Sequence, residues 1–302
     1  MSILLLGAEG QVGQELQRSL TCLIPKMGPI IALGRAQLDL TDLAAIAAKI
    51  KAIAPTLIVN SAAYTAVDNA ESEPQLAYRI NAEAPGAIAR SAQACGATLI
   101  HISTDYVFPG HDGSPRVESD PTGPLSVYGK TKLAGEVAIR AALERHIILR
   151  TAWVYGCYGK SNFVKTMIRL AKEQSSLSVV NDQIGSPTWA TDIATAIAQL
   201  ADKPQHSPGT YHFTSIGIAS WYDFAVAIFE NARALGIPLA IETVTPIATA
   251  NYPTPAQRPA YSVLNCQKLT DVLGYTAPPW RDSLRQMLQQ YVQLNPSLKM
   301  DK

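Results

Sequence analysis

Cysteine is scarce in this chain, and its few copies are not arranged for metal binding. The sequence contains four cysteines, which are Cys22, Cys95, Cys157 and Cys266. They lie far apart and show none of the short spacings of zinc sites, and four cysteines in a chain of this length do not make a disulfide-dense secreted scaffold. We therefore expect no metal site and a reducing location, which is the cytoplasm.

An excess of charge and a long apolar run are also missing. Lysine and arginine number 25 and aspartate and glutamate 24, so the formal net charge of +1 gives no reason to expect a nucleic-acid partner. The apolar opening at residues 3–6 is too short for a signal peptide or a membrane span. Hydrophobic residues still make up 47% of the chain, which is enough for a large core. We expect no membrane partner.

Short apolar segments alternate with helical patterns in the first half of the chain. Runs at residues 3–6, 30–33, 57–60, 99–102 and 146–149 have the composition of strands buried on both faces. The alternation predicts an α/β fold in which residues 1–150 form a doubly wound parallel sheet of the Rossmann type. Residues 151–302 are expected to form mainly a smaller α/β lobe for substrate, with segments near 177–180 and 210–214 returning to the main sheet.

A glycine-rich turn joins the first strand to the first helix. Gly7, Gly10 and Gly13 stand at the spacing that permits a tight turn, close approach of a pyrophosphate and packing of helix on strand. The free N–H groups at the helix start favour a phosphate there. The second strand leads to Arg35, which could pair with the 2′-phosphate of NADPH; a solvated loop arginine is the other interpretation.

Tyr128 and Lys132 are four residues apart in a helical pattern that follows the strand ending at Thr104. On a helix their side chains lie one turn apart on the same side. A nearby ammonium favours the phenolate, so we expect Lys132 to lower the pKa of Tyr128, while Thr104 supplies a hydroxyl to the same point. Such a pair also occurs by chance as packing residues, so its weight depends on the nicotinamide site.

Three local features in the rest of the chain carry expectations. Thr41 is expected to cap the helix that begins near Leu43, and Ser220 the helix that begins at Trp221. The proline-rich stretch 246–259 reads as a surface loop or lid. It carries Arg258, and an exposed arginine on a mobile loop suits bidentate capture of a phosphate.

These motifs resemble the short-chain dehydrogenase/reductase superfamily, extended branch, and within it the dTDP-4-dehydrorhamnose reductase family. The resemblance runs from Met1 to about Leu294. It rests on eight segments in order, which are residues 7–13, 38–42, 59–73, 103–110, 128–136, 150–155, 181–188 and 252–259.

The resemblance implies reduction of the C4′ ketone of dTDP-4-dehydro-L-rhamnose with NADPH or NADH, giving dTDP-L-rhamnose for cell-surface polysaccharide. It implies that Tyr128 donates the proton, that Lys132 holds the nicotinamide ribose and that Thr104 bonds the reacting oxygen. Substrate contacts are implied for Thr104, Asp105, Trp153, Asn162 and Arg258. Cofactor contacts are implied, besides Tyr128, Lys132 and Arg35, for Gly7, Gly10, Gln11, Val12, Gly13, Asp39, Leu40, Ala62, Ala63, Thr65 and Ser103.

One departure from the family concerns Mg²⁺. Some members are dimers bridged by Mg²⁺ between glutamates, and Glu15 matches one such ligand. Residues 189–192 and 291–293 contain no glutamate, however, and a hard cation needs several carboxylate oxygens. We therefore expect no Mg²⁺ bridge, and either a monomer or a weak, metal-free homodimer.

Two other functions stay open. The chain also resembles the NADP-binding regulatory β subunit of methionine adenosyltransferase, from which Trp153, residues 181–188 and residues 252–259 distinguish it as a reductase. The same scaffold also serves NDP-sugar epimerases and dehydratases. These usually carry an Asp-Glu pair after the catalytic strand, whereas Thr104 is followed here by Asp105 and Tyr106.

Overall fold

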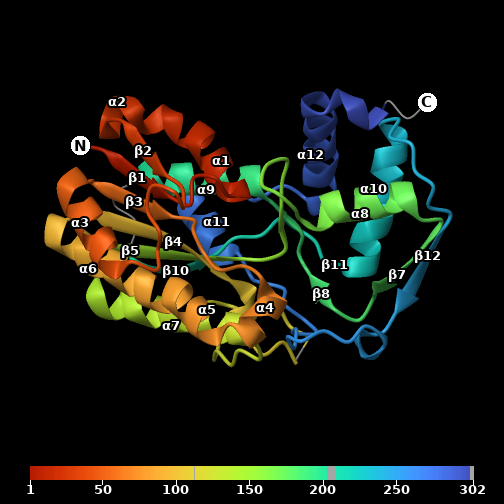
Figure 1. The fold of residues 1–302 in the computed structure, drawn as a ribbon, viewed down its shortest axis with the longest axis horizontal. Helices are drawn as coiled ribbons and strands as arrows, with labels where there is room; N and C mark the ends of the chain where they lie inside the picture. The colour runs from red at the N-terminus through yellow and green to blue at the C-terminus, as the bar shows by residue number, and fades with distance from the viewer. Residues whose placement is uncertain (112, 203–207, 300–302) are drawn as a thin grey trace.

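A six-stranded, entirely parallel sheet forms the centre of the computed structural model, which describes residues 1–111, 113–202 and 208–299 (Figure 1). Neighbouring strands follow one another in the order β2-β1-β3-β4-β5-β10. Their bounds are β1 Ile3–Leu6, β2 Ile30–Leu33, β3 Leu57–Asn60, β4 Thr98–Thr104, β5 His146–Thr151 and β10 Gly209–His212. The predicted doubly wound α/β fold is confirmed.

The strand order reverses beside β1, and this reversal positions the site. The chain passes from β1 to β2 on one side and then to β3 on the other side of β1. The carboxyl ends of parallel strands all lie along the same edge of the sheet. Ligands of doubly wound sheets bind outside these carboxyl ends, at the point where the strand order reverses. The glycine turn after β1, the segment after β3 and Thr104 at the end of β4 therefore all lie at the same edge.

Helices cover both faces of the sheet (Figure 1). On one face α1 (Gln11–Ser19) and α9 (Ala190–Asp202) bury apolar side chains against alternate residues of the strands. On the other face α3 (Leu43–Ile53), α6 (Ala84–Cys95) and α7 (Val127–Ala142) do the same. The buried strands carry apolar residues on both faces because both faces are covered. Shorter elements of this part are η1 Leu20–Leu23, α2 Ile24–Met27, α4 Val67–Ser72, α5 Pro74–Tyr78, the π-helical turn η2 Arg79–Glu83, η3 Asp105–Val107 and α11 Gln267–Leu273.

A second apolar core gathers α8 (Phe163–Glu173), α10 (Trp221–Ala234) and α12 (Trp280–Leu294). Three small pairs of strands accompany them: β7 (Ser176–Val180) with β12 (Thr243–Ile247), β8 (Ile184–Gly185) with β11 (Ala219–Ser220), and β6 (Val154–Tyr155) with β9 (Thr188–Trp189). The turns η4 Thr249–Asn251 and η5 Pro296–Lys299 complete the described elements. Ser220 caps α10 in a reciprocal capping box with Asp223, as predicted.

The expectation that two later segments return to the main sheet is only half right. The segment near 210–214 joins the main sheet as β10, but the segment near 177–180 is β7, which pairs in parallel with β12 instead. Only the last two residues of β7 are buried, which suits a surface ribbon and not a strand inside a covered sheet. The division of the chain near residue 150 stays a prediction.

Two further corrections concern caps and loops. Asp42, not Thr41, caps α3, because Asp42 accepts the Ala45 N–H while the Thr41 hydroxyl donates to Asp39. The stretch 246–259 is not all loop, since Pro246 and Ile247 belong to β12. Among the helices of the described ranges, none has the length and apolar character needed to cross a membrane.

Candidate active site

The glycine turn after β1 has the geometry of a phosphate cradle. Gly7 has a φ of +80°, and a Cβ there would lie 2.7 Å from the Ala62 nitrogen. At Gly13 a Cβ would lie 2.1 Å from the Gly7 oxygen, so only glycine lets α1 pack this closely. Gly10 precedes α1 without a side-chain cap, and the N–H groups of the first turn of a helix have no intrahelical partner. This arrangement fits a diphosphate, which takes up such N–H groups and the positive end of the helix dipole.

The end of β3 lies against this turn. Asn60 Oδ1 accepts the Ala62 N–H at 3.1 Å and the Ser61 hydroxyl donates to the Leu6 carbonyl at 2.7 Å. Ala62 and Ala63 are half-buried and Thr65 is exposed. The structure thus brings Ala62, one of the predicted cofactor residues, against Gly7 of the glycine turn.

Arg35 and Asp39 follow β2 and lie near each other on the surface. Arg35 Nε is 3.8 Å from Asp39 Oδ2; the Arg35 side chain is largely exposed and the Asp39 side chain is half-buried. Asp39 accepts the backbone N–H and the hydroxyl of Thr41, and these hydrogen bonds lower the pKa of Asp39. The Leu40 side chain, by contrast, is buried in the core beneath the sheet.

Thr104 and Tyr128 bring two hydroxyls together at the end of β4. Tyr128 lies in the first turn of α7, which Ser126 caps by accepting the Gly129 N–H at 3.2 Å. Tyr106 contacts both residues: its N–H donates to the Thr104 hydroxyl at 3.2 Å, and its ring meets the Tyr128 ring in an edge contact at 5.6 Å between centroids. A Cβ at Gly129 would lie 2.3 Å from the Tyr106 oxygen, so glycine after Tyr128 permits this approach.

The expected effect of Lys132 on Tyr128 is wrong. Burial raises the pKa of Tyr128 to about 12, and only the Thr104 hydrogen bond acts against it. Lys132 donates to the Ile102 carbonyl at 2.7 Å and lies 3.3 Å from His101 Nε2. Burial also lowers the pKa of Lys132 to about 8. The phenol therefore holds its proton firmly at neutral pH, which suits a group that donates a proton more than one that removes it.

Asp105 is the buried carboxyl nearest to these hydroxyls. Its Oδ1 accepts the Thr104 hydroxyl at 2.9 Å, and the side chain is 2% exposed. Burial raises the pKa of Asp105 to about 6, although hydrogen bonds with Ser262 and Thr104 oppose the rise. At neutral pH the folded protein thus holds a carboxylate in an unfavourable environment.

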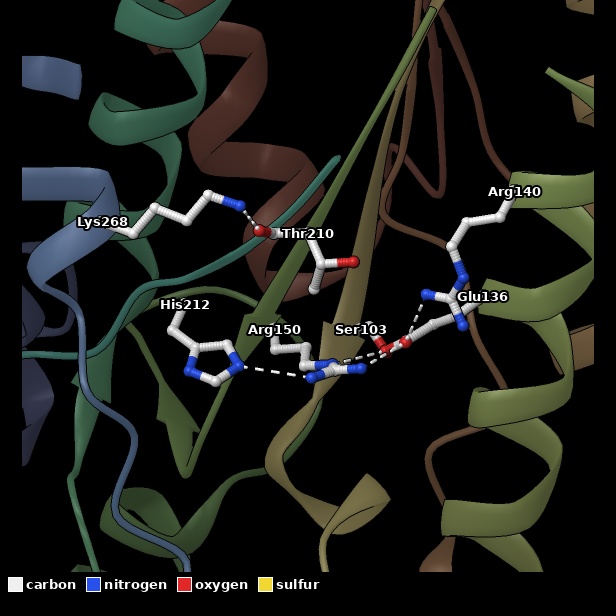
Figure 2. Close-up of polar contacts among 7 residues, drawn as sticks. All are labelled: Ser103, Glu136, Arg140, Arg150, Thr210, His212 and Lys268. Carbon is white, nitrogen blue, oxygen red and sulfur yellow. Dashed lines mark hydrogen bonds and ion pairs between the residues drawn. The ribbon is translucent and has the colours of Figure 1, made fainter. Parts of the chain in front are cut away.

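A buried ion pair joins α7 to the sheet beside this site. Figure 2 shows the Glu136 carboxylate from α7 facing the Arg150 guanidinium from β5. Arg150 donates from Nε at 2.9 Å and from Nη2 at 2.7 Å, and the Ser103 hydroxyl donates at 2.6 Å. Ser103 was expected at the cofactor, whereas its hydroxyl is used here to hold Glu136. Sequence reasoning missed Glu136 and Arg150, although Glu136 stands one turn after Lys132.

His212 extends this pair toward the edge of the sheet (Figure 2). Its Nε2 lies 3.4 Å from Arg150 Nη1 and its Nδ1 lies 3.0 Å from the Arg116 carbonyl oxygen. Burial and Arg150 lower the pKa of His212 to about 3, so the imidazole is neutral. Its Nε2 can then accept from Arg150 while Nδ1–H donates to the carbonyl.

Trp153 forms a flat aromatic wall with Trp221, a residue that sequence reasoning did not assign to the site. The two rings stack at 3.5 Å and 3°. Trp153 has a φ of +47°, which is costly for a bulky residue, and a Cβ at Gly185 would lie 2.5 Å from its ring. Trp221 Nε1 donates to Gln183 at 3.2 Å. Residues 183 and 185 of the predicted polar loop thus support this wall.

The two residues expected at the nucleotide diphosphate lie in different settings. Arg258 makes a bidentate ion pair with Asp68, at 2.7 and 3.0 Å, and its side chain is only 20% exposed. Both Nη groups of its guanidinium are therefore bound to Asp68, and the prediction of an exposed arginine is wrong. Asn162 caps α8 and donates to Gln11 Oε1 at 3.3 Å, which places it beside the glycine turn.

Glu15 does not stand in a carboxylate cluster of the kind that Mg²⁺ needs. It is buried, and burial together with Asp192 raises its pKa, while Thr191 and Arg18 lower it. Within the described parts of the chain, no group of three or more His, Cys, Asp or Glu side chains could hold a metal ion.

Comparison with known proteins identifies the family. The family described as RmlD substrate binding domain matches residues 1–293. The chain belongs to this family. Among curated members, the dTDP-4-dehydrorhamnose reductase of Escherichia coli K12 is 46% identical over 297 residues, covering 96% of this chain and 98% of that protein.

Solved structures of RmlD relatives have the same fold. A dTDP-4-dehydrorhamnose reductase from Clostridium acetobutylicum is 40% identical, with a TM-score of 0.88. Another from Bacillus anthracis, solved in complex with NADP, is 37% identical with a TM-score of 0.88. Each match covers 96% of this chain and 99% of the other.

The burial of Asp105 predicts a pH-dependent gain of stability in the variant Asp105→Asn. The folded pKa of about 6 lies above the unfolded value of 3.8, so the wild-type fold loses stability as pH rises from 4 to 7. The neutral amide avoids this loss, and we expect a stabilisation at pH 7 that exceeds the one at pH 4 by about 2–3 kcal/mol. Urea unfolding at both pH values measures it.

The matched control for this test is Asp271→Asn, which changes an exposed carboxyl on α11. It should shift stability equally at both pH values. An equal effect of Asp105→Asn at pH 4 and pH 7 would show that Asp105 is not held in an unfavourable charged state.

Proposed function

We propose that the chain is a dTDP-4-dehydrorhamnose reductase, which reduces the C4′ ketone of dTDP-4-dehydro-L-rhamnose with NADPH. The observation that carries this proposal is the position of Thr104 and Tyr128, which both contact Tyr106 at the sheet edge that also carries the glycine turn. Its support from relatives is the 46% identity, over nearly the whole chain, to a protein of that name, and the NADP in a related structure.

The residues of this chain divide the work of the reaction. Bound NADPH supplies the hydride. The N–H groups at the start of α1 hold its diphosphate, and Tyr128 and Thr104 direct their hydroxyls at the substrate oxygen. Tyr128 passes its proton to that oxygen as negative charge develops there, because the phenol is fully protonated at neutral pH. Lys132 lies one turn further along α7, where it holds the nicotinamide ribose.

The substrate contacts remain proposals. The Trp153–Trp221 stack offers a flat apolar surface for the sugar ring, and the Asp105 carboxyl lies beside the reacting hydroxyls. Asp68 fixes the plane of the Arg258 guanidinium, and Arg258 contacts the substrate diphosphate with the N–H groups that the Asp68 pair does not use. Asn162 is better placed for the dinucleotide, through Gln11.

The alternative functions are less well supported. A regulatory subunit would need the cofactor site but not the paired hydroxyls or the aromatic wall. A dehydratase usually needs a further carboxyl after Asp105, where this chain has Tyr106. We propose a monomer or weak homodimer in the cytoplasm.

Tyr128→Phe tests the function and the proton donor together. Wild-type protein should oxidise NADPH when dTDP-4-dehydro-L-rhamnose is added, as loss of nicotinamide absorbance shows. Without the phenolic hydroxyl, turnover should fall by ~10²–10⁴-fold, the usual contribution of general acid catalysis, while NADPH binding stays nearly intact. The control Tyr155→Phe removes a buried hydroxyl near the Trp280 carbonyl and should keep turnover.

Two outcomes would contradict this account. Wild-type protein that binds NADPH but does not reduce the sugar would favour the regulatory function. A Tyr128→Phe variant as fast as wild type would remove Tyr128 from the reaction.

Arg35→Ala tests whether the loop after β2 selects NADPH. If Arg35 pairs with the 2′-phosphate, its loss should reduce the ratio of kcat/KM for NADPH over NADH by about tenfold, the value of a charge-assisted hydrogen bond. The control is Arg169→Ala, an exposed arginine paired with Glu173 on α8. An unchanged ratio would leave Arg35 as a solvated loop residue.

A further inference from the structure

Three buried polar side chains form a line behind the catalytic helix. Asn60 of β3 and His101 of β4 are both 0% exposed, and Lys132 of α7 is 2% exposed. Asn60 Nδ2 lies 3.1 Å from His101 Nδ1, and His101 Nε2 lies 3.3 Å from Lys132 Nζ. Away from water each of these donors and acceptors needs a partner of the opposite kind. The positions of the protons along the line can therefore be worked out.

The orientation of Asn60 is set at the far end. Its Oδ1 accepts the Ala62 N–H at 3.1 Å, so its Nδ2 group, which only donates, faces His101. His101 Nδ1 must then be the acceptor. Burial holds the pKa of His101 well below its ordinary value, so the ring is neutral and carries one proton. That proton is on Nε2, the nitrogen that faces Lys132.

Lys132 completes the line in only one of its two charge states. An ammonium has three donors and no acceptor, so it cannot bond to an N–H that points at it. An uncharged amine has a lone pair that accepts from His101 Nε2–H, while one of its own N–H groups donates to the Ile102 carbonyl at 2.7 Å. Asn60, His101, Lys132 and the Ile102 carbonyl all have a hydrogen-bond partner only when Lys132 is the uncharged amine.

We propose that His101, oriented by Asn60, is a positioning residue that favours the uncharged amine form of Lys132. The proposal deepens the proposed function, because Lys132 is the residue expected to hold the nicotinamide ribose. When Lys132 takes up a proton from solvent, its ammonium must turn from His101 toward other acceptors. The ribose hydroxyls and the Tyr128 oxygen are of that kind. His101 thereby couples the charge of Lys132 to its direction.

The surroundings of Lys132 both lower and raise its pKa. Burial lowers the pKa of Lys132 to about 8, and Glu136 on the same helix acts to raise it. Glu136 is itself neutralised by Arg150 from β5 and Arg140 from α7. From β4, Lys132 faces the neutral His101 and the Ile102 carbonyl.

The tautomer of His101 tests the proposal in the unmodified protein. Side-chain ¹⁵N NMR of the full chain, with the His101 signals assigned by their loss in His101→Gln, distinguishes the two neutral tautomers. We expect the proton on Nε2 at neutral pH. A proton on Nδ1, or on both nitrogens, would overturn the proposal. The tautomer is read from the unmodified protein, and His101→Gln serves only to assign the signals.

The substitution Asn60→Asp should reverse the direction of the hydrogen bonds on both sides of His101. The aspartate keeps Oδ1 for the Ala62 N–H but presents an acceptor to His101, so the imidazole proton should move to Nδ1. His101 Nε2 then accepts from an ammonium, and the ¹³Cε titration midpoint of Lys132 should rise by about one to three pH units.

The matched control is Asn81→Asp. Asn81 is also buried, and it donates to Thr131, the neighbour of Lys132, without touching His101. The variant Asn81→Asp adds the same charge beside α7. It should leave the His101 tautomer unchanged and shift the titration midpoint of Lys132 by less than Asn60→Asp does. Equal Lys132 shifts in both variants would reduce the effect to added charge and overturn the proposal.

The reductase assay is independent of this measurement. Protein that fails to reduce the sugar but shows the Nε2–H tautomer would contradict the proposed function and not the Asn60–His101 device. Protein that reduces the sugar but carries the His101 proton on Nδ1 would contradict the Asn60–His101 device and not the proposed function.

Discussion

The buried ion pair between Glu136 and Arg150 is the contact on which the geometry of the site depends. Glu136 stands one turn beyond Lys132 on α7, and Ser103, which also bonds Glu136, directly precedes Thr104. Through Arg150 the Glu136 carboxylate joins α7, which carries the phenol and the amine, to β5. Through Ser103 the same carboxylate joins α7 to β4, the strand that carries the Thr104 hydroxyl. Such a pair is costly to break, because loss of one partner leaves an uncompensated charge inside the protein, at a cost of ~3–5 kcal/mol. Its value here is that it fixes two elements relative to each other.

Exclusion of water is the second constraint on the site. Burial shifts the pKa values of Tyr128, Lys132 and Asp105 in the direction that favours the uncharged form of each group. A dry site of this kind strengthens every hydrogen bond within it and makes each missing partner costly. A phenol that keeps its proton until charge develops on the substrate is what a ketone reduction requires.

The parts of this picture that follow from local sequence were predictable. Alternating apolar runs located the strands of the sheet, the glycine spacing located the turn after β1, and the four-residue spacing of Tyr128 and Lys132 located them on one helix. The predictions that were wrong concern residues whose partners are remote in the chain. β7 pairs with β12 rather than the main sheet, Arg258 binds Asp68, 190 residues away, and the pKa of Tyr128 follows from burial that no spacing reveals. Asn60 and His101 went unnoticed because each lies inside an apolar strand and their contact appears only in three dimensions.

Transfer of label from the cofactor to the sugar tests the central claim most directly. Purified protein would be given dTDP-4-dehydro-L-rhamnose and NADPH carrying deuterium at the transferable position of the nicotinamide, and the product examined by mass spectrometry and NMR. The account predicts dTDP-L-rhamnose with one deuterium at C4′, and no deuterium at that carbon when unlabelled NADPH is used in heavy water. A product without label at C4′, or with label taken from solvent, would contradict hydride delivery at the edge of the sheet where Thr104 and Tyr128 meet.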